Sequence, residues 1–322
     1  MKMGLHIGMN KKSYGHKGTI LIISAVLLLF MGSCRKEQKA PTVKKPDTTA
    51  VKPLPPLKPE LKIKYGIYAT GDSAVVKRFV EAYTDTQRTI ILSLNRIDDR
   101  NISINDTLIL PDTFLTSLLP YSPFPKEIQM LDSVPKILLF SYPIEAFAAY
   151  DSGRLIRWGP TSMGKLTTPT PTGLFHTNWK SKETISTDNE EWILPWYFNL
   201  ENKRGISIHQ FALPGRPASH ACARLRAEDA EWIYYWADQW IITADGESMV
   251  AYGTPVIIFG KYNFKEKPPW KAMPVNPDTA KYTKADLEKI IKEYMPLIKE
   301  RQEARDSVIA ARIRFNLTGG NL

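Results

Sequence analysis

The feature that most constrains the fold is a series of short apolar runs over residues 136–260, each ended by turn residues. KILLFSYPIEAFAAY comes first, Asp151-Ser152-Gly153 supplies a turn, and GLFHTNW, EWILPWYFNL, GISIHQF and VAYGTPVIIFG follow. Short apolar runs between turn signals predict strands. The segment Thr168–Gly173 (TPTPTG) can be neither a helix nor a central strand, because its prolines lack a backbone N–H. We therefore expect a mainly β domain over residues 136–260.

Helices are expected at two places after the first strands. Within the β domain, residues 228–240 place Trp232, Tyr235, Trp236 and Trp240 on one stripe, which predicts that these aromatic side chains pack in the core. Residues 261–322 form a C-terminal extension with a helix that begins in the capping-box-like Thr283–Asp286. Pro296 should kink or split that helix.

Residues 61–112 predict a small α/β module with the order strand, helix, helix, strand. The strands are LKIKYGIY and Asp106–Pro111, and the helices are Asp72–Tyr83 and Arg88–Ile97. With GDS, ILSLNRI and INDTLILPD at these places, the segment resembles a degenerate LysM peptidoglycan-binding module. A purely structural cap is the alternative. A Pro-rich connecting segment, residues 113–135, leads from it to the β domain.

The N-terminus indicates export. Residues 1–18 carry four lysines and no acid, and the apolar run that follows over residues 19–33 is shorter than the ~20 residues of a spanning helix. Met31-Gly32-Ser33-Cys34 resembles a bacterial lipobox, which implies a lipoprotein signal peptide over residues 1–33 and a lipid on Cys34. The Pro/Lys-rich segment 34–60 would be an extended linker. We expect an exported protein of the cell envelope, lipid-anchored in the periplasm; an uncleaved anchor or a plain secretory signal is the alternative.

Charge and composition restrict the classes of molecule that the protein is expected to bind. The formal charge of the whole chain is +10, and removal of the four lysines of the signal leaves +6, which suits an anionic surface such as a cell wall. No compact Lys/Arg run with interleaved aromatics is present, so we expect no nucleic-acid partner. The cysteine and histidine spacings of common metal sites are absent as well, so neither a metal nor another cofactor is expected. The oligomeric state cannot be read.

Cys222 is the candidate nucleophile. The chain has two cysteines, and a lipid on Cys34 would leave Cys222 with no disulfide partner. Two of the three histidines outside the signal, His209 and His220, lie within 13 residues of it. An imidazole that takes the thiol proton produces the nucleophilic thiolate, so this arrangement favours a catalytic cysteine over a buried one.

Four segments then carry a family resemblance. Ser219–Leu225 (SHACARL) resembles the S-H-G-C-x-R signature of L,D-transpeptidases. Ile208-His209, Gly164–Gly173 (GKLTTPTPTG) and Gly253–Val256 (GTPV) match other parts of the family pattern, in the family's order. The resemblance implies a β-sandwich with the cysteine at one end.

The resemblance also implies an activity. Such enzymes act on the tetrapeptide stems of peptidoglycan, where Cys222 would form a thioester, release D-Ala and pass the acyl group to a second stem to form L,D crosslinks. His209 would be the base and then the acid, oriented by the backbone carbonyl of Gln210. The N–H groups of Ala221 and Cys222 would form the oxyanion hole, and His220 would line the site.

Three neighbouring residues leave questions open. Arg224 could bind a stem-peptide carboxylate or hold the loop through carbonyls, and Ser219 would order the loop, with contact to substrate as the alternative. Ala221 stands where the family usually has glycine, and it fits only if its φ is negative. An L,D-carboxypeptidase, attachment to another protein's amine, a non-catalytic wall-binding lipoprotein and a cysteine peptidase of another fold are the alternatives.

Overall fold

The computed structural model describes residues 62–70, 74–102, 107–186 and 189–317. The expected signal peptide over residues 1–33, the lipidation site Cys34 and the linker 34–60 lie outside the described residues. Within the described ranges, no helix combines the length and the apolar character needed to cross a membrane.

Nine strands of the β domain form one sheet. They are β3 (Lys136–Ser141), β4 (Ala146–Asp151), β5 (Arg154–Ser162), β6 (Gly173–His176), β7 (Lys180–Ile185), β8 (Ile193–Glu201), β9 (Ile206–Gln210), β10 (Ala223–Leu225) and β13 (Pro255–Phe259). Their order across the sheet is β6-β13-β3-β4-β5-β10-β9-β8-β7. Neighbours are antiparallel except for β9 with β10 and β3 with β13, which are parallel. The prediction of a mainly β domain is confirmed.

The sheet curls so that its two halves share one core. Buried side chains of β3 and β13 pack with side chains of β8 and β9, which lie toward the other edge: Leu138, Phe140, Val256, Ile258, Phe198, Leu200, Ile206 and Ile208. The two layers of the expected sandwich are therefore the two halves of a single sheet. The alternate residues of β3 and β13, such as Ile137, Leu139 and Ile257, enter a second core on the opposite face, as the two-residue period of a strand requires.

Helix α3 (Ala227–Trp236) buries Ala230 and Ile233 in the core shared by the two halves of the sheet. Its tyrosine Tyr235 is 61% exposed, so the prediction that the aromatic stripe packs in the core is wrong for this residue. Trp232 and Trp236 are half-buried and stack with their ring centroids 5.0 Å apart. The helix buries its face of smaller side chains instead, and it ends before Trp240.

The N-terminal module has the expected order of elements: β1 (Tyr65–Ala69), α1 (Val75–Ala82), α2 (Asp85–Asn95) and β2 (Thr107–Pro111). Strands β1 and β2 pair antiparallel. Thr84 begins α2 with a capping box, in which its hydroxyl accepts from Gln87 N and the Gln87 side chain accepts from Thr84 N. Short 3₁₀ turns lie at Asp99–Asn101, Leu119–Tyr121, Gln129–Leu131 and Pro269–Ala272.

Arg96, directly after α2, joins the module to the rest of the protein. It is 1% exposed, and its guanidinium donates from Nε to Ile144 O at 2.8 Å and from Nη1 to Ser93 O at 2.6 Å. The guanidinium carbon lies 5.5 Å from the ring centroid of Trp158 and 5.3 Å from that of Trp270. Burial lowers the pKa of Arg96 to about 9. Segments from the module, the β domain and the C-terminal extension thus meet at one side chain.

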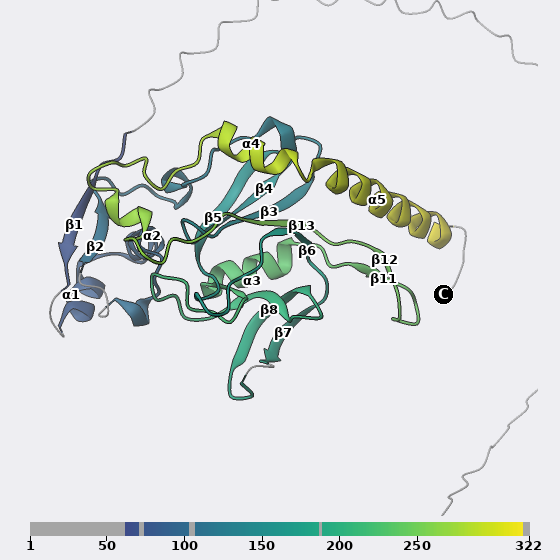
Figure 1. Cartoon of the computed structure of the whole chain (residues 1–322), viewed down its shortest axis with the longest axis horizontal. Helices are drawn as coiled ribbons and strands as arrows, with labels where there is room; N and C mark the ends of the chain where they lie inside the picture. Colours follow the sequence, from purple (N-terminus) through teal and green to yellow (C-terminus); the bar gives the residue numbers. More distant parts are fainter. Residues whose placement is uncertain (1–61, 71–73, 103–106, 187–188, 318–322) are drawn as a thin grey trace, which may run out of the picture. The chain divides into compact units, whose positions relative to one another are not determined.

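The C-terminal extension contains α4 (Lys284–Lys292) and α5 (Met295–Leu317), split at Pro296 as expected. Thr283 caps α4 together with Asp286, which confirms the predicted capping box. Figure 1 shows α5 running beside the hairpin of β11 (Ile241–Ile242) and β12 (Met249–Ala251). α4 and the start of α5 cover the second core of the sheet with Leu287, Ile291 and Ile298.

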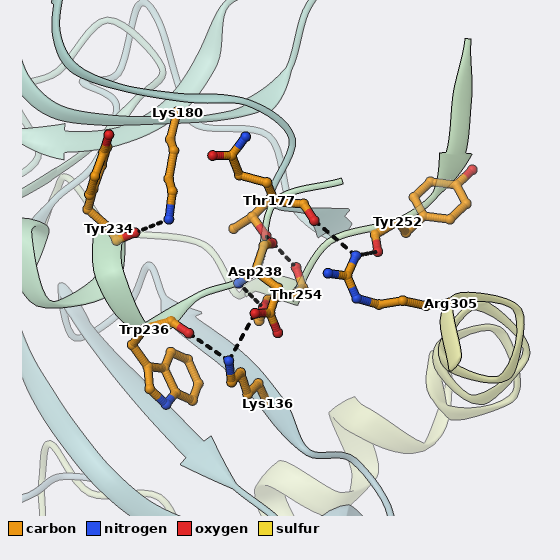
Figure 2. A network of polar contacts seen from close by, with 10 residues as sticks. Lys136, Thr177, Lys180, Tyr234, Trp236, Asp238, Tyr252, Thr254 and Arg305 are labelled. Atoms are coloured by element: carbon orange, nitrogen blue, oxygen red, sulfur yellow. Dashed lines mark hydrogen bonds and ion pairs between the residues drawn. The ribbon is translucent and has the colours of Figure 1, made fainter. Parts of the chain in front are cut away.

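Polar contacts fix α3 and α5 to the ends of the strands (Figure 2). Arg305 of α5 donates to the carbonyl oxygens of Gln239 and Tyr252 at 2.9 and 2.6 Å. Lys136, at the start of β3, donates to the carbonyl of Trp236 at 2.9 Å and to the Asp238 carboxylate at 3.0 Å. The orphan carbonyls at the end of α3 therefore receive a cationic donor, which suits the negative end of a helix.

Candidate functional site

A small cleft gathers most of the residues that the sequence singled out. Its lining consists of Ser186, Trp192, Leu194, His209, Phe211, Ser219, His220, Cys222 and Arg224. The parallel pairing of β9 with β10 explains the gathering, because it places Ala223 opposite Ile208 and Arg224 opposite His209. Residues more than ten positions apart in sequence therefore share one wall.

The TPTPTG segment holds the loop before β10 in place. Gly164 pairs with Ser219 as an isolated parallel bridge, and Lys165 N donates to Ser219 O at 3.0 Å. The hydroxyl of Thr170 accepts from Gly164 N at 2.8 Å. A Cβ on Gly164 would lie 2.2 Å from Thr168 O, so only glycine fits at this position.

His209 is buried and neutral at pH 7. Its pKa is lowered to about 4, mainly by burial; the hydrogen bond to Gln210 acts in the opposite direction, and the charge of Arg224 contributes to the lowering. Its Nδ1 lies 3.0 Å from the carbonyl oxygen of Gln210. A carbonyl can only accept, so Nδ1 carries the proton and Nε2 keeps its lone pair. The ring is thus prepared to take a proton.

The sulfur of Cys222 contacts two groups that the sequence did not single out. The Ser207 hydroxyl donates to Sγ at 3.2 Å, and Sγ lies 3.4 Å from the carbonyl oxygen of Gly205. Ser207 stands two residues before His209 on β9, so both side chains point to the same face of the strand. That alternation was readable, but the register that puts Cys222 beside Ser207 was not.

Arg224 contacts an aromatic ring. Its guanidinium carbon lies 4.5 Å from the ring centroid of Phe211. Burial lowers the pKa of Arg224, while the Cys222 sulfur raises it. In the described part of the chain no carbonyl or carboxylate accepts a hydrogen bond from this side chain, so its planar donors are available to a ligand.

Ala221 departs from expectation. Its φ is +74°, in the left-handed region, so the condition that alanine fits only with a negative φ is wrong. The loop is tied on both sides of Ala221, because the Ser219 hydroxyl and the Thr170 hydroxyl both donate to the carbonyl of Cys222. Alanine takes the glycine-like backbone conformation at a penalty of roughly 1–2 kcal/mol.

The other two histidines outside the expected signal, His220 and His176, take separate places. His220 lies at the cleft with Lys165 Nζ 2.8 Å from its Nε2 and with the Trp192 ring centroid 5.4 Å away. His176 is not in the cleft; it is buried under α5 and accepts from Arg301 at Nδ1, 3.1 Å away. No group of three or more His, Cys, Asp or Glu side chains among the described residues is arranged to hold a metal ion.

Residues 136–258 match the family model of the L,D-transpeptidase catalytic domain. The resemblance of this segment to that family is therefore confirmed, whereas the LysM-like character of the N-terminal module stays a prediction. A search of curated proteins found no match.

Several solved structures are similar to part of the chain. An L,D-transpeptidase from Mycobacterium smegmatis is 20% identical, with 39% of this chain and 59% of that chain covered and a TM-score of 0.31. An L,D-transpeptidase from Stackebrandtia nassauensis is 18% identical, with 40% of this chain and 57% of that chain covered and a TM-score of 0.32. L,D-transpeptidase 3 from Mycobacterium tuberculosis is 21% identical, with 39% of this chain and 61% of that chain covered and a TM-score of 0.31. The chain spans about three fifths of the length of these proteins, and the likeness of residues 136–258 to the family rests on the family model.

Proposed function

We propose that the L,D-transpeptidase-like domain of residues 136–258 is a cysteine acyltransferase that makes L,D crosslinks in peptidoglycan. Its donor substrate is a tetrapeptide stem with a diamino acid at the third position and D-Ala at the fourth. Cys222 is the nucleophile, and the acceptor is the side-chain amine of a second stem. The observation that carries the proposal is that Cys222 shares one cleft with the neutral imidazole of His209.

The reaction divides into two transfers. The Cys222 sulfur bonds to the carbonyl carbon between the third and fourth residues while His209 Nε2 takes the thiol proton. The carbon–nitrogen bond then breaks, and His209 returns the proton to the amine of the departing D-Ala. The acceptor amine next attacks the thioester carbonyl, the carbon–sulfur bond breaks, and the sulfur recovers a proton.

Two groups of this chain would assist these steps. The N–H groups of Ala221 and Cys222 stabilise the oxyanion, and the left-handed turn at Ala221 sets their direction. Arg224 binds a carboxylate of the stem peptide, since its guanidinium has no hydrogen-bond acceptor within the described residues. The Gln210 carbonyl fixes the ring of His209, Ser219 orders the loop, and His220 lines the cleft.

The experiment measures D-Ala release and crosslinked products from purified tetrapeptide stems. Cys222→Ala should abolish both, while Cys34→Ala, which removes the other cysteine, should leave the rates unchanged. Incubation with a carbapenem should add one acyl group to the Cys34→Ala chain and none to the Cys222→Ala chain, as intact mass would show. Full D-Ala release by Cys222→Ala would refute the mechanism.

The same assay separates the alternatives by their products. A tripeptide without crosslinked dimer indicates an L,D-carboxypeptidase, because water has then taken the acyl group. Stem joined to a protein amine indicates protein attachment. No D-Ala release by the unmodified chain indicates a non-catalytic wall-binding protein.

We also propose that a lipid on Cys34 anchors the protein to a membrane. The lipobox-like sequence before Cys34 supports a lipid on that residue, which would place the catalytic domain at the end of the linker 34–60 in the periplasm. Expressed in a bacterial cell, the chain should sediment with membranes, and Cys34→Ala should shift it to the soluble or the uncleaved form. An unchanged mature, membrane-bound product in that variant would contradict the lipid anchor.

A further inference from the structure

The low basicity of His209 raises a question about Cys222. A thiol of ordinary pKa, about 8.5, holds its proton far more tightly than an imidazole whose pKa is about 4. Between two such groups, proton transfer is unfavourable by roughly four powers of ten. His209 therefore cannot by itself hold the sulfur as a thiolate, and other groups must stabilise the negative charge.

A chain of hydrogen-bond donors ends at the sulfur on the side of β8 and β9. Asn178 Nδ2 donates to Asn199 Oδ1 at 2.9 Å, and Asn199 Nδ2 donates to the Tyr197 hydroxyl oxygen at 3.5 Å. The pKa of Tyr197 is raised by burial, while hydrogen bonds to Asn199 and Ser207 lower it. Ser207 then donates to Cys222 Sγ at 3.2 Å.

The last donor of this chain, the Ser207 hydroxyl, points at the sulfur. Asn199 Nδ2 donates to the Tyr197 hydroxyl and also to the carbonyl oxygen of Glu201 at 3.4 Å, Tyr197 is hydrogen-bonded to Ser207, and the Ser207 proton is directed at Sγ. Tyr197, Asn199 and Ser207 are all buried, at 6%, 1% and 0% exposed, so little water competes for these donors. Aligned hydrogen bonds polarise one another, and a donor to a charged acceptor is the strongest kind.

We propose that Ser207 is a catalytic residue whose hydroxyl donates to the Cys222 sulfur and stabilises it as the thiolate, and that Tyr197 and Asn199 are positioning residues that fix the direction of this donor. The proposal rests on Cys222 being the nucleophile, as proposed above. It gives Ser207 a role during acylation, when charge builds on the sulfur, and again when the thioester breaks.

Among the described residues, five other charged or titratable side chains lie around the sulfur. They are His209 and Arg224 on the two paired strands, His220 in the loop with Lys165 bonded to it, and Tyr197 on β8. The substitution Ser207→Ala removes none of these groups. A change in the titration of Cys222 on that substitution therefore reports the donor itself.

The test is the pH dependence of alkylation of Cys222 by iodoacetamide in the full chain. Mass spectrometry of the peptide that contains Cys222 keeps Cys34 out of the measurement. For Ser207→Ala we expect the midpoint of the profile to rise by about one pH unit. Because thiolate nucleophilicity follows basicity with a slope of about 0.4–0.5, the rate at pH 6 should fall about threefold and the high-pH plateau should rise about threefold.

Two further variants complete the test. Ser207→Thr keeps a hydroxyl and should restore the original profile. Tyr197→Phe keeps the ring stacked on Trp179, 4.9 Å between centroids, and should shift the midpoint in the same direction by a smaller amount. Crossing profiles are not expected from a loss of packing, which would change all rates together.

Clear outcomes would overturn the proposal. A Ser207→Ala profile that coincides with that of the unmodified chain removes the role of Ser207. If Ser207→Ala does not fold, an unshifted Tyr197→Phe profile refutes the donor chain. Alkylation needs no peptidoglycan, so a failure of the D-Ala release assay would refute the proposed function without changing these profiles.

Discussion

Each of two buried histidines should lower the stability of this protein by about 2 kcal/mol when the pH falls from 7 to 5. Burial lowers the pKa of His209 to about 4 and that of His176 to about 3. Burial is the main cause at both sites, and the charge of Arg301 adds to it at His176. Both rings therefore stay neutral in the folded protein throughout this pH range.

The sign and the size of this change in stability follow from the difference in proton binding between the folded and the unfolded chain. An unfolded histidine has a pKa of about 6.5, so below that pH the unfolded chain binds protons that the folded chain does not. Stability is fully present above pH 6.5 and is lost as the pH falls toward the folded pKa. Each pH unit is equivalent to about 1.4 kcal/mol once the unfolded histidine is protonated, which gives about 2 kcal/mol per residue at pH 5.

The assay is urea denaturation at pH 7 and pH 5, followed by tryptophan fluorescence. His176→Gln and His209→Gln remove one titrating ring each, and each should make the difference between the two free energies of unfolding about 2 kcal/mol smaller. Ile208→Val is the matched control. It lies beside His209 in the buried core and should lower stability equally at both pH values.

Other groups affect the unmodified chain and cancel in the comparison. Burial raises the pKa of Glu145 well above its usual value, so this residue contributes stability that is lost as the pH rises. It works against the histidines between pH 5 and 7. The difference between variant and unmodified chain is therefore the decisive quantity, and a variant that keeps the whole pH dependence would refute the reasoning.

Three other substitutions test separate features. Arg96→Met should destabilise the fold by about 3 kcal/mol, because it leaves buried carbonyls such as that of Ile144 without their donor; a loss below about 1 kcal/mol in urea denaturation would contradict this. Arg224→Lys keeps the charge but loses the planar fork, so KM for a stem peptide should rise roughly tenfold with little change in kcat; an unchanged KM would remove its binding role. Ala221→Gly relieves the left-handed alanine and opens the oxyanion corner, so the ratio of crosslinked dimer to hydrolysed tripeptide should rise; a lower ratio would contradict that explanation.

Local patterns in the sequence predicted much of this fold. The apolar runs of residues 136–260 became strands, and Thr283 and Pro296 mark the helix start and the helix split that the sequence indicated. Cys222, His209 and Arg224 do line one cleft. These predictions depend on residues near one another in the chain or on a family pattern.

The features that could not be predicted from the sequence depend on contacts between residues that are far apart in the chain. Ser207 gains its contact with the sulfur only through the parallel register of β9 and β10. In the sequence, Arg96 resembles an ordinary surface arginine at a helix end. In the structure it packs against Trp158 and Trp270, which lie far from it in the chain. Tyr235 faces solvent because the opposite face of α3 packs against the strands. The local sequence pattern does not predict which face of the helix packs there.

The position of Arg96 also determines when this protein can fold. A ribosome releases the N-terminal end first, yet Arg96 completes its packing only after Trp270 has emerged, and the core around it also needs Ile298. The packing around Arg96 can therefore be completed only after almost all of the chain has been synthesised, and contacts between such distant segments form slowly. For a polypeptide proposed to cross a membrane before it works, that delay favours an incompletely folded chain, which a translocation channel accepts.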